Sequence, residues 1–521
     1  MNRRRLRIVI PAYPAFNIYS HIANKTTALG PVCVATSVNE LEGWDVEVID
    51  ENNLGRYGPR GDSGGADHEL LQKQRPADVV GFYGGLTSTV PRLYRLARQY
   101  RQMGVVTIAG GQHFAGENTA EALQADIDYV VLGEGEEAIR ELLEVVEGRR
   151  DAGSVRGIAY IDSDRVVRTP PRELMQDFDR LAYPDFSLVR YARIKIFPVS
   201  RIRGCCMNCE FCTVKDAPRC ASVERLMGNI SYLVETYNAR DFFIVDDLFG
   251  QQRDETVRFC QLLARYQEEI GRRLTTTVQI RLDKARDPEL LAAMRQAGIL
   301  SVAIGFESPV DEELKAMNKA VRARDMMALA RTYHRFGFLV HGMFIFGYPL
   351  KEGVEFSMPV NERVKRFRRF IRKSKIDTVQ VLLPVPLPNT ELRQRLEKEG
   401  RVYPVSDVGW EYYDGNFPLF EPDDPATAKE LQAGAKRIMS RVYEFRYGLL
   451  VVASILSFPA VALWLHNLKE GWRRWYHTWY TRVTRFGGWL TMRQWTIQFK
   501  KSDFLSRLGR ARRSLGADQS S

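Results

Sequence analysis

Cysteine is scarce in this chain, with seven residues in 521. So few cysteines in a chain of this length exclude a secreted scaffold held by disulfides. Four of the seven fall between positions 205 and 212, which is typical of metal ligation in a reducing compartment. A secretory signal is also missing, because the apolar run Leu6–Ile10 is too short for a signal-peptide core and fits a buried first strand better. We therefore expect a cytoplasmic protein of two or three domains.

An excess of positive charge is absent from most of the chain, although the formal net charge is +11. Residues 431–521 hold sixteen Lys or Arg and four Asp or Glu, so residues 1–430 are almost neutral, with 59 basic and 60 acidic side chains. Six of the eight tryptophans lie in the same final segment. The basic, aromatic tail is therefore chemically different from the rest of the chain.

Short runs rich in β-branched residues alternate with helix-length segments over residues 6–148. Helices are expected at Val90–Met103 and Glu134–Val146, for example. Five βα units of this length predict a doubly wound, Rossmann-like parallel sheet that binds ligands at the carboxyl ends of its strands. A β-rich connector, Arg156–Arg168, and a proline-punctuated stretch, Thr169–Pro184, follow. The predicted strands are Leu6–Ile10, Val46–Ile49, Val79–Phe82, Val105–Ala109 and Tyr129–Leu132.

A second series of strands and helices begins near Ile194, with helices at Asp254–Gln267 and Arg324–Phe336, for example. Six βα units predict a partial, TIM-like (β/α)6 barrel whose loops above the strand ends carry the chemistry. The fold class is therefore α/β, with domains at 1–150 and 191–400, a linker at 151–190 and a helical extension at 401–521. The predicted barrel strands are Ile196–Ser200, Phe242–Val245, Thr275–Gln279, Ser301–Ile304, His341–Phe346 and Thr378–Leu383.

Three cysteines with the spacing C-x3-C-x2-C, namely Cys205, Cys209 and Cys212, follow the first barrel strand. A [4Fe–4S] cluster normally takes four cysteine ligands, so three on one tight loop leave one iron open for an external ligand. The alternative is a structural zinc site with Cys206 or Cys220 as the fourth ligand. Such sites usually pair one CxxC with a second, distant pair, which this sequence lacks. The spacing therefore favours a cluster over zinc.

At this position the motif resembles that of the radical S-adenosylmethionine (SAM) superfamily, with Phe211 as the aromatic residue between the last two cysteines. The resemblance implies that the open iron chelates the amine and carboxylate of SAM. It also implies that electron transfer breaks a C–S bond of SAM to give a 5′-deoxyadenosyl radical. A reductant of the flavodoxin or ferredoxin type is then an expected partner.

Polar residues at the ends of later barrel strands fit the same resemblance, because SAM needs contacts to its amine, ribose and carboxylate there. Two of these side chains have an alternative role, since Arg281 can pair with Asp283 and Glu307 can cap the helix that begins near Pro309. The SAM contacts implied by the resemblance are Phe211, Asp246, Arg281, Gly305 and Glu307.

Glycine-rich turns end three of the N-terminal strands, at residues 84–89, 110–113 and 133–136. Glycine lets the backbone approach a large ligand closely, and helix starts offer N–H groups to it. The Gly-x-Gly-x-x-Gly fingerprint of dinucleotide binding does not follow the first strand. The turns instead resemble the cobalamin-binding domain that precedes the barrel in one branch of the radical SAM superfamily. The implied cobalamin contacts are Gly84, Thr87, Ser88, Gly110, Gly111, Gly133, Glu134 and Gly135.

One departure from many cobalamin proteins concerns the ligand below the cobalt. Those proteins carry Asp-x-His-x-x-Gly after the first strand, whereas residues 11–17 here read Pro-Ala-Tyr-Pro-Ala-Phe-Asn. His21 has no Asp two residues before it, and His113 is expected to stabilise its turn. The resemblance therefore implies cobalamin bound without a histidine below the metal.

The tail contains nineteen residues without a formal charge, Tyr447–Leu465, followed by tryptophans and arginines over residues 472–480. A helix buried on the barrel explains the apolar run but not the tryptophans among cations, and a nucleic-acid-binding tail explains the cations but not the apolar run. Membrane attachment explains both. We therefore expect residues 440–510 to hold the enzyme at the inner face of the membrane, with a single spanning helix over 447–465 as the alternative to peripheral attachment. A nucleic-acid partner is not expected.

The residues and the resemblance together predict a cobalamin-dependent radical SAM methyltransferase. The deoxyadenosyl radical would take hydrogen from an unactivated carbon, which then receives a methyl group from methylcobalamin. The tail favours a small-molecule substrate that resides in the bilayer, such as a lipid or isoprenoid. The alternatives are a radical cyclase, oxidase or rearrangement enzyme without net methyl transfer, and a non-catalytic sensor of metal or cobalamin.

Overall fold

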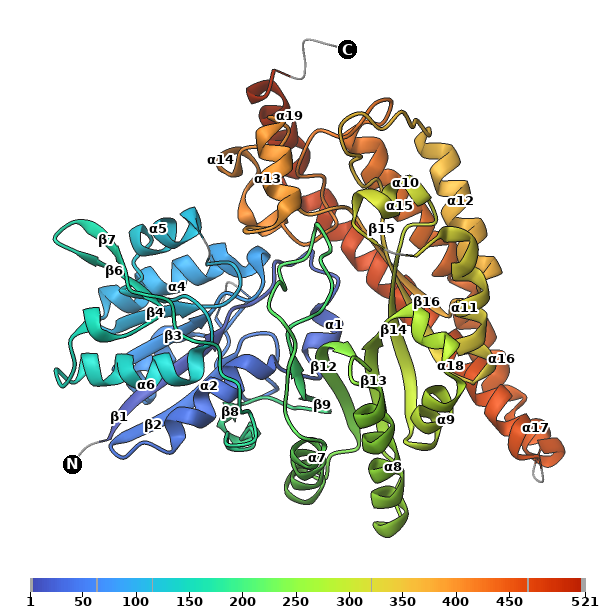
Figure 1. Ribbon diagram of the computed structural model, residues 1–521, viewed down its shortest axis with the longest axis horizontal. Coiled ribbons are helices and arrows are strands. Elements are labelled where there is room, and N and C mark those ends of the chain that lie inside the picture. The colour runs from blue at the N-terminus through green and yellow to red at the C-terminus, as the bar shows by residue number, and fades with distance from the viewer. Residues whose placement is uncertain (1–2, 62–63, 115, 320, 466–467, 517–521) are drawn as a thin grey trace.

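The structure is a computed structural model that describes residues 3–61, 64–114, 116–319, 321–465 and 468–516. Two α/β units lie side by side, and a helical C-terminal extension packs on the second unit (Figure 1). The predicted α/β class, with a doubly wound sheet before a partial barrel, is confirmed.

The first sheet has eight strands in the order β7-β6-β5-β4-β3-β1-β2-β8, and its neighbouring strands are parallel except in the β5-β6-β7 meander. All five predicted strands of this domain are present. Residues 151–190, predicted as a linker with a β-rich connector at Arg156–Arg168, supply three strands of the sheet. Their short β-branched runs find free edges beside β5 and β2. The strand bounds are Arg4–Ile10 (β1), Trp44–Asp50 (β2), Val79–Tyr83 (β3), Val106–Gly110 (β4), Tyr129–Val131 (β5), Ile158–Asp162 (β6), Arg165–Arg168 (β7) and Val189–Arg190 (β8).

Both faces of this sheet are covered, because successive side chains of a strand point to opposite sides. Ile8 and Val48 pack with α2 and α6, whereas Val9 and Phe82 pack with α4 and α5. This explains why the central strands are continuously apolar rather than alternating. The helices of the unit are Ser20–Ala23 (α1), Leu29–Asn39 (α2), His68–Gln74 (α3), Val90–Gln102 (α4), Glu117–Gln124 (α5) and Gly135–Val146 (α6).

The second sheet has six strands in the order β16-β15-β14-β13-β12-β9, and every neighbouring pair is parallel. All six predicted barrel strands are present. They are Ile196–Val199 (β9), Asp241–Phe249 (β12), Thr275–Ile280 (β13), Ile299–Glu307 (β14), Leu339–Ile345 (β15) and Thr378–Leu382 (β16). The main helices of this unit are Val223–Tyr237 (α7), Arg253–Glu269 (α8), Pro288–Gln296 (α9), Asp311–Ala316 (α10), Ala323–Arg335 (α11) and Val360–Lys373 (α12).

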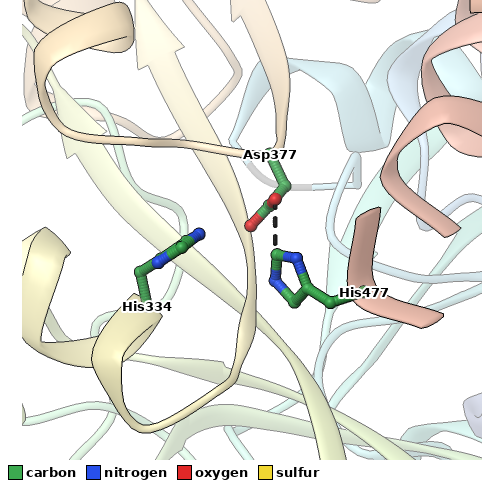
Figure 2. Close-up of side chains that lie close together, drawn as sticks. All are labelled: His334, Asp377 and His477. Carbon is green, nitrogen blue, oxygen red and sulfur yellow. Dashed lines mark ion pairs between the residues drawn. The ribbon is translucent and has the colours of Figure 1, made fainter. Parts of the chain in front are cut away.

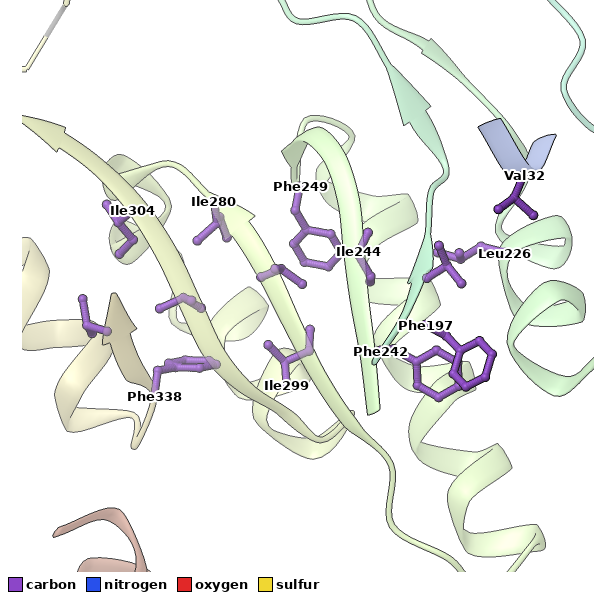
Figure 3. Packing of buried hydrophobic residues seen from close by; sticks show 14 of the residues in the cluster. Val32, Phe197, Leu226, Phe242, Ile244, Phe249, Ile280, Ile299, Ile304 and Phe338 are labelled. Carbon is purple, nitrogen blue, oxygen red and sulfur yellow. The ribbon is translucent and has the colours of Figure 1, made fainter. Parts of the chain in front are cut away.

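One hydrophobic cluster joins the two sheets. It runs from Leu6 and Val32 in the first unit through Phe197 and Leu226 to the barrel strands (Figure 3). The two units therefore share a hydrophobic core and do not meet through a hydrated polar interface. This shared core fixes the position of one unit relative to the other.

The connection between the sheets is short. Strand β8 ends at Arg190 and β9 begins at Ile196. The residues between them are also tied to the first unit, because the N–H groups of Lys195 and Ile196 donate to the Lys25 carbonyl at 2.8 and 3.0 Å.

The tail corrects part of the membrane prediction. The uncharged run is divided at Ser457, with Pro459 as the second residue of the following helix, and none of the helices in the described ranges is long and apolar enough to cross a bilayer. Trp495 and Phe504 are buried against the rest of the chain, so these two aromatic residues of the tail belong to the core and not to an exposed surface. The tail helices are Ala428–Val442 (α15), Arg446–Leu456 (α16), Phe458–Leu465 (α17), Lys469–Lys501 (α18) and Phe504–Ser514 (α19).

Candidate active site

The three motif cysteines lie on a loop whose two ends are paired. Short strands β10 (Ile202–Arg203) and β11 (Arg219–Cys220) are antiparallel and bring the ends together. Gly204 has φ +91°, and a Cβ there would lie 2.5 Å from the Ala217 carbonyl oxygen. Glycine is therefore required for the loop to close on itself just before the first cysteine.

The three thiols form one electrostatic group. Burial raises the pKa of Cys205, Cys209 and Cys212, and neighbouring thiols of the loop raise each pKa further. Among the described residues, no three cysteine sulfurs lie within 4.8 Å of one another, as ligands of a single zinc ion would. Cys206 is exposed. Three thiols spread around a loop fit three corners of an iron–sulfur cluster better than a mononuclear site.

A buried ion pair lies behind this loop. Glu210, between the second and third cysteines, accepts hydrogen bonds from the Tyr348 hydroxyl at 2.6 Å and from Arg395 Nε at 2.7 Å. Its backbone N–H donates to the Met317 carbonyl at 3.3 Å. Sequence reasoning missed Glu210 and Arg395, since 185 residues separate them and no spacing pattern connects them.

Two adjacent aspartates near the carboxyl end of β12 have different surroundings. Asp246, the predicted SAM contact, is 3% exposed, and its Oδ1 accepts from Ser200 Oγ and from the N–H groups of Arg201 and Ile202. Burial raises the pKa of Asp246 to about 6. Asp247 lies on the other face of the strand and accepts from the Gly204 N–H at 2.7 Å, directly beside Cys205. Asp246 is thus hydrogen-bonded to the residues that follow β9, and Asp247 is hydrogen-bonded to the start of the cysteine loop.

The remaining predicted SAM contacts gather near the loop but are paired with one another or with neighbours. Arg281 makes the anticipated ion pair with Asp283 at 2.7 Å. Glu307, at φ +58°, pairs with Lys319 at 2.9 Å, and a Cβ on Gly305 would lie 2.4 Å from the Glu307 carboxylate.

The aromatic residue of the cysteine motif belongs to the same group. The Lys319 ammonium lies 5.7 Å from the centroid of the Phe211 ring. The position of Lys319 was not anticipated, although it lies in a Met-Asn-Lys segment that follows the fourth barrel strand.

A cavity of about 800 Å³ lies between the two units. Its walls come from the ends of β3, β4 and β5, from α2 and α6, and from the barrel residues Arg203 and Asp247. The predicted cobalamin contacts that line it are Gly110, Gly111, Gly133, Glu134 and Gly135. A large ligand held by the first unit would therefore adjoin the cysteine loop of the second.

Glu134 connects the two units at the cavity wall. Its carboxylate accepts hydrogen bonds from Arg203 Nη1 at 2.9 Å and from Arg219 Nη1 at 3.0 Å. Glu134 therefore binds both β10 and β11, the strands that close the cysteine loop. Arg203 also pairs with Glu136 at 2.5 Å. The hydrogen bond from the Met175 N–H, together with Arg203 and Arg219, holds the pKa of Glu134 below its usual range against the opposing effect of burial. A predicted ligand contact is thus also a tie between the domains.

The other predicted cobalamin contacts, Gly84, Thr87 and Ser88, are not among the described residues that line the cavity. Thr87 and Ser88 begin the 3₁₀ turn η1 (Thr87–Thr89) and are buried under η5 (Trp410–Tyr412). The His113 ring packs edge-on against Trp410, with centroids 4.9 Å apart, and its Nδ1 lies 3.3 Å from Thr87 Oγ1. Burial lowers the pKa of His113 to about 3. This packing agrees with a turn-stabilising histidine.

Two family models match the chain in the predicted order. The B12 binding domain matches residues 18–143, and the radical SAM superfamily matches residues 199–356.

Curated relatives are identical to the chain at about a quarter of the aligned positions. An uncharacterized methyltransferase of Pyrococcus horikoshii is 26% identical over 406 residues, covering 75% of this chain and 83% of the relative. An anaerobic magnesium-protoporphyrin IX monomethyl ester cyclase of Rubrivivax gelatinosus is 25% identical, covering 66% and 62% respectively. The hopanoid C-2 methylase of Rhodopseudomonas palustris is 26% identical, covering 51% and 48%.

Solved structures share the fold at lower identity. The cobalamin-dependent SAM radical enzyme OxsB, with aqua-cobalamin and SAM bound, has a TM-score of 0.61 and 15% identity, covering 99% of this chain and 84% of that one. The radical SAM methyltransferase TsrM of Kitasatospora setae, with cobalamin and a [4Fe–4S] cluster bound, has a TM-score of 0.60 and 18% identity, covering 76% and 78%.

Proposed function

Because the chain belongs to the radical SAM enzymes that carry a B12-binding domain, we propose that it methylates an unactivated carbon of a small-molecule substrate. The two matched domains confirm the predicted cofactors, namely a [4Fe–4S] cluster, SAM and cobalamin. When bound, these groups supply a carbon-centred radical and a methyl donor, the two components needed at an sp³ carbon without a lone pair.

The observation that carries the proposal is the position of the cavity. Glycine turns of the first unit and Asp247 of the second line the same space, and Asp247 is hydrogen-bonded to the residue that precedes Cys205. Asp247 and Gln251 hold the start of the cysteine loop, since Gln251 Nε2 donates to the Gly204 carbonyl at 3.1 Å. The ion pair between Arg203 and Glu134 links the barrel side of the cavity to the side formed by the first unit. The residues thus orient both binding regions toward one shared cavity.

We further propose that the substrate is lipid-like and is met at a membrane surface. The support is an apolar tip made by α16 and α17, whose side chains include Leu456 at 77% and Trp464 at 76% exposure. A patch of this kind is unusual on a protein without a partner. Arg446 lies at one end of the tip, and basic residues of α18 follow it in the sequence. The other exposed large hydrophobic residues of these two helices are Leu449, Leu450, Val452, Ile455 and Phe458.

The central test uses anaerobically reconstituted enzyme with SAM that carries a labelled methyl group. Cys209→Ala is expected to lose both cluster iron and 5′-deoxyadenosine formation, because a three-ligand site cannot spare a thiolate. Cys260→Ala is the matched control, since Cys260 is a fully buried residue of α8 far along the chain from the motif. Deoxyadenosine formation by Cys209→Ala would refute the assignment.

Product mass separates methylation from its rival. The cyclase relative favours radical chemistry without net methyl transfer as the second candidate. With a lipid extract as substrate, methylation adds one CH2 and the label, whereas cyclisation or oxidation adds neither.

Co-sedimentation with anionic vesicles tests the apolar tip of α16 and α17. Leu456→Glu is expected to reduce binding, and Leu505→Glu, at an exposed position on α19, is not. Equal binding of the two variants would remove the membrane proposal.

A further inference from the structure

Three side chains from distant parts of the sequence lie close together where the tail helix α18 meets the barrel. His334 lies in the last turn of α11, Asp377 directly precedes β16, and His477 lies on α18 (Figure 2). One ligand atom from each lies within 4.8 Å of the others. The His477 Nε2 to Asp377 Oδ1 distance is 3.7 Å, and the two imidazole centroids are 5.1 Å apart.

The carboxylate of this group is held in a fixed orientation. Asp377 is 6% exposed, and its Oδ2 accepts from the Val340 N–H at 2.9 Å. Its Oδ1 accepts from Thr481 Oγ1, also at 2.9 Å. Arg485 Nε donates to the Asp377 backbone carbonyl at 2.7 Å. Hydrogen bonds of this kind orient the ligands of a metal site.

The donor set also suits a metal ion. Two imidazoles side by side with a carboxylate give two nitrogens and one oxygen, which is a zinc donor set. Zinc takes such donors at about 2.0–2.2 Å, so neighbouring ligand atoms lie roughly 3.4 Å apart around a tetrahedral ion. The three atoms here lie within 4.8 Å of one another, which is at most about 1.4 Å more than that spacing.

We propose that His334, Asp377 and His477 bind one Zn²⁺ ion that fastens the tail helix α18 to the barrel. The group lies at the amino end of β16, whereas the cysteine loop follows the carboxyl end of β9, so the two sites are at opposite ends of the sheet. The ion serves structure, because it links a barrel helix, a barrel strand and the tail. The proposal does not depend on methyl transfer.

The test is metal analysis of the full-length holoenzyme with cluster and cobalamin in place. The protein is treated with a mild chelator, given one equivalent of ZnCl2 and desalted. We expect about one zinc per chain in the unmodified protein and background zinc in His477→Ala, with iron and cobalt unchanged. His21→Ala is the matched control, because His21 is an exposed histidine of α1 outside the cluster, and it should retain zinc.

The extended fine structure of the zinc X-ray absorption spectrum identifies the ligand atoms by their distances from the metal. The proposal requires nitrogen and oxygen neighbours at about 2.0–2.1 Å, whereas zinc on the cysteine loop would show sulfur at about 2.3 Å. A sulfur shell, no retained zinc, or full zinc retention in both His334→Gln and His477→Ala would each overturn it. If His477→Ala loses iron and cobalt through misfolding, the conservative His334→Gln variant and the spectrum of the unmodified protein decide. Zinc should also raise the Tm of the unmodified protein and leave that of His334→Gln unchanged.

Discussion

Glu210 offers a quantitative test of how the cysteine loop is held. Its side chain is 4% exposed and accepts from Tyr348 and from two nitrogens of Arg395, at 2.7 and 3.2 Å. The change Glu210→Gln keeps the size of the side chain and removes its charge. Arg395, whose own side chain is 18% exposed, is then left without its buried counter-ion.

The expected cost follows from the pair's burial. Breaking a buried ion pair costs roughly 3–5 kcal/mol, but the glutamine oxygen still accepts one hydrogen bond. A hydrogen bond to a charged group contributes about 1.5–3 kcal/mol, so we expect a net loss near 2 kcal/mol. Because about 1.4 kcal/mol is a factor of ten, local opening of the loop should become roughly 30-fold more frequent.

Native-state hydrogen exchange measures this opening at two loop amides. The Glu210 N–H donates to the Met317 carbonyl at 3.3 Å, and the Cys212 N–H donates to the Cys209 carbonyl at 3.1 Å. Both should lose protection by the same factor, and iron retention should fall with them.

The control is Glu391→Gln, which removes a partner of Lys215 on the same loop. That pair spans 3.0 Å, but its side chains are 31% and 44% exposed, so its loss should cost below about 0.5 kcal/mol. Equal protection in the two variants would show that the buried pair does not hold the loop.

Three further predictions concern other regions. Gly111→Ala should weaken cobalamin binding at least about tenfold in absorbance titrations, because φ is +125° and the new Cβ would lie 2.6 Å from the Gly84 carbonyl carbon. Gly148→Ala, at a positive φ with open space, should bind normally. Burial raises the pKa of Asp414 from 3.8 to about 7, so folding favours its neutral form and stability is lost as the pH rises through that range. Asp414→Asn should therefore flatten the fall in Tm between pH 5.5 and 7. Cys260→Ser should lower Tm through an unpaired buried hydroxyl and leave iron content unchanged.

The strands were predictable because local composition decides them. Strands such as β3 are continuous apolar runs, the barrel strands show alternating burial, and all eleven predicted strands are present. Residues 151–190 were harder, since a short run such as Val189–Arg190 becomes a strand only because β2 offers a free edge. That edge depends on the order of strands in space, which the local sequence does not contain.

The candidate site was predictable only in part, for a geometric reason. Adjacent residues of a strand face opposite sides, so Asp246 and Asp247 have different environments although the sequence marks both equally. The prediction for the tail was wrong in part, for another reason. Its tryptophans suggested lipid, yet Trp495 is packed against Phe417 and Phe499 of the same chain. The composition of a segment shows that its aromatic side chains favour burial. Whether they are buried in lipid or in the protein core depends on tertiary contacts.

The short connection between the sheets has a kinetic consequence. Five residues, 191–195, separate β8 from β9, so the two sheet edges can move apart by roughly 20 Å at most even with the connection fully extended. A pair of modules tethered so closely face each other at millimolar effective concentration or above. The encounter between the two binding regions is therefore intramolecular.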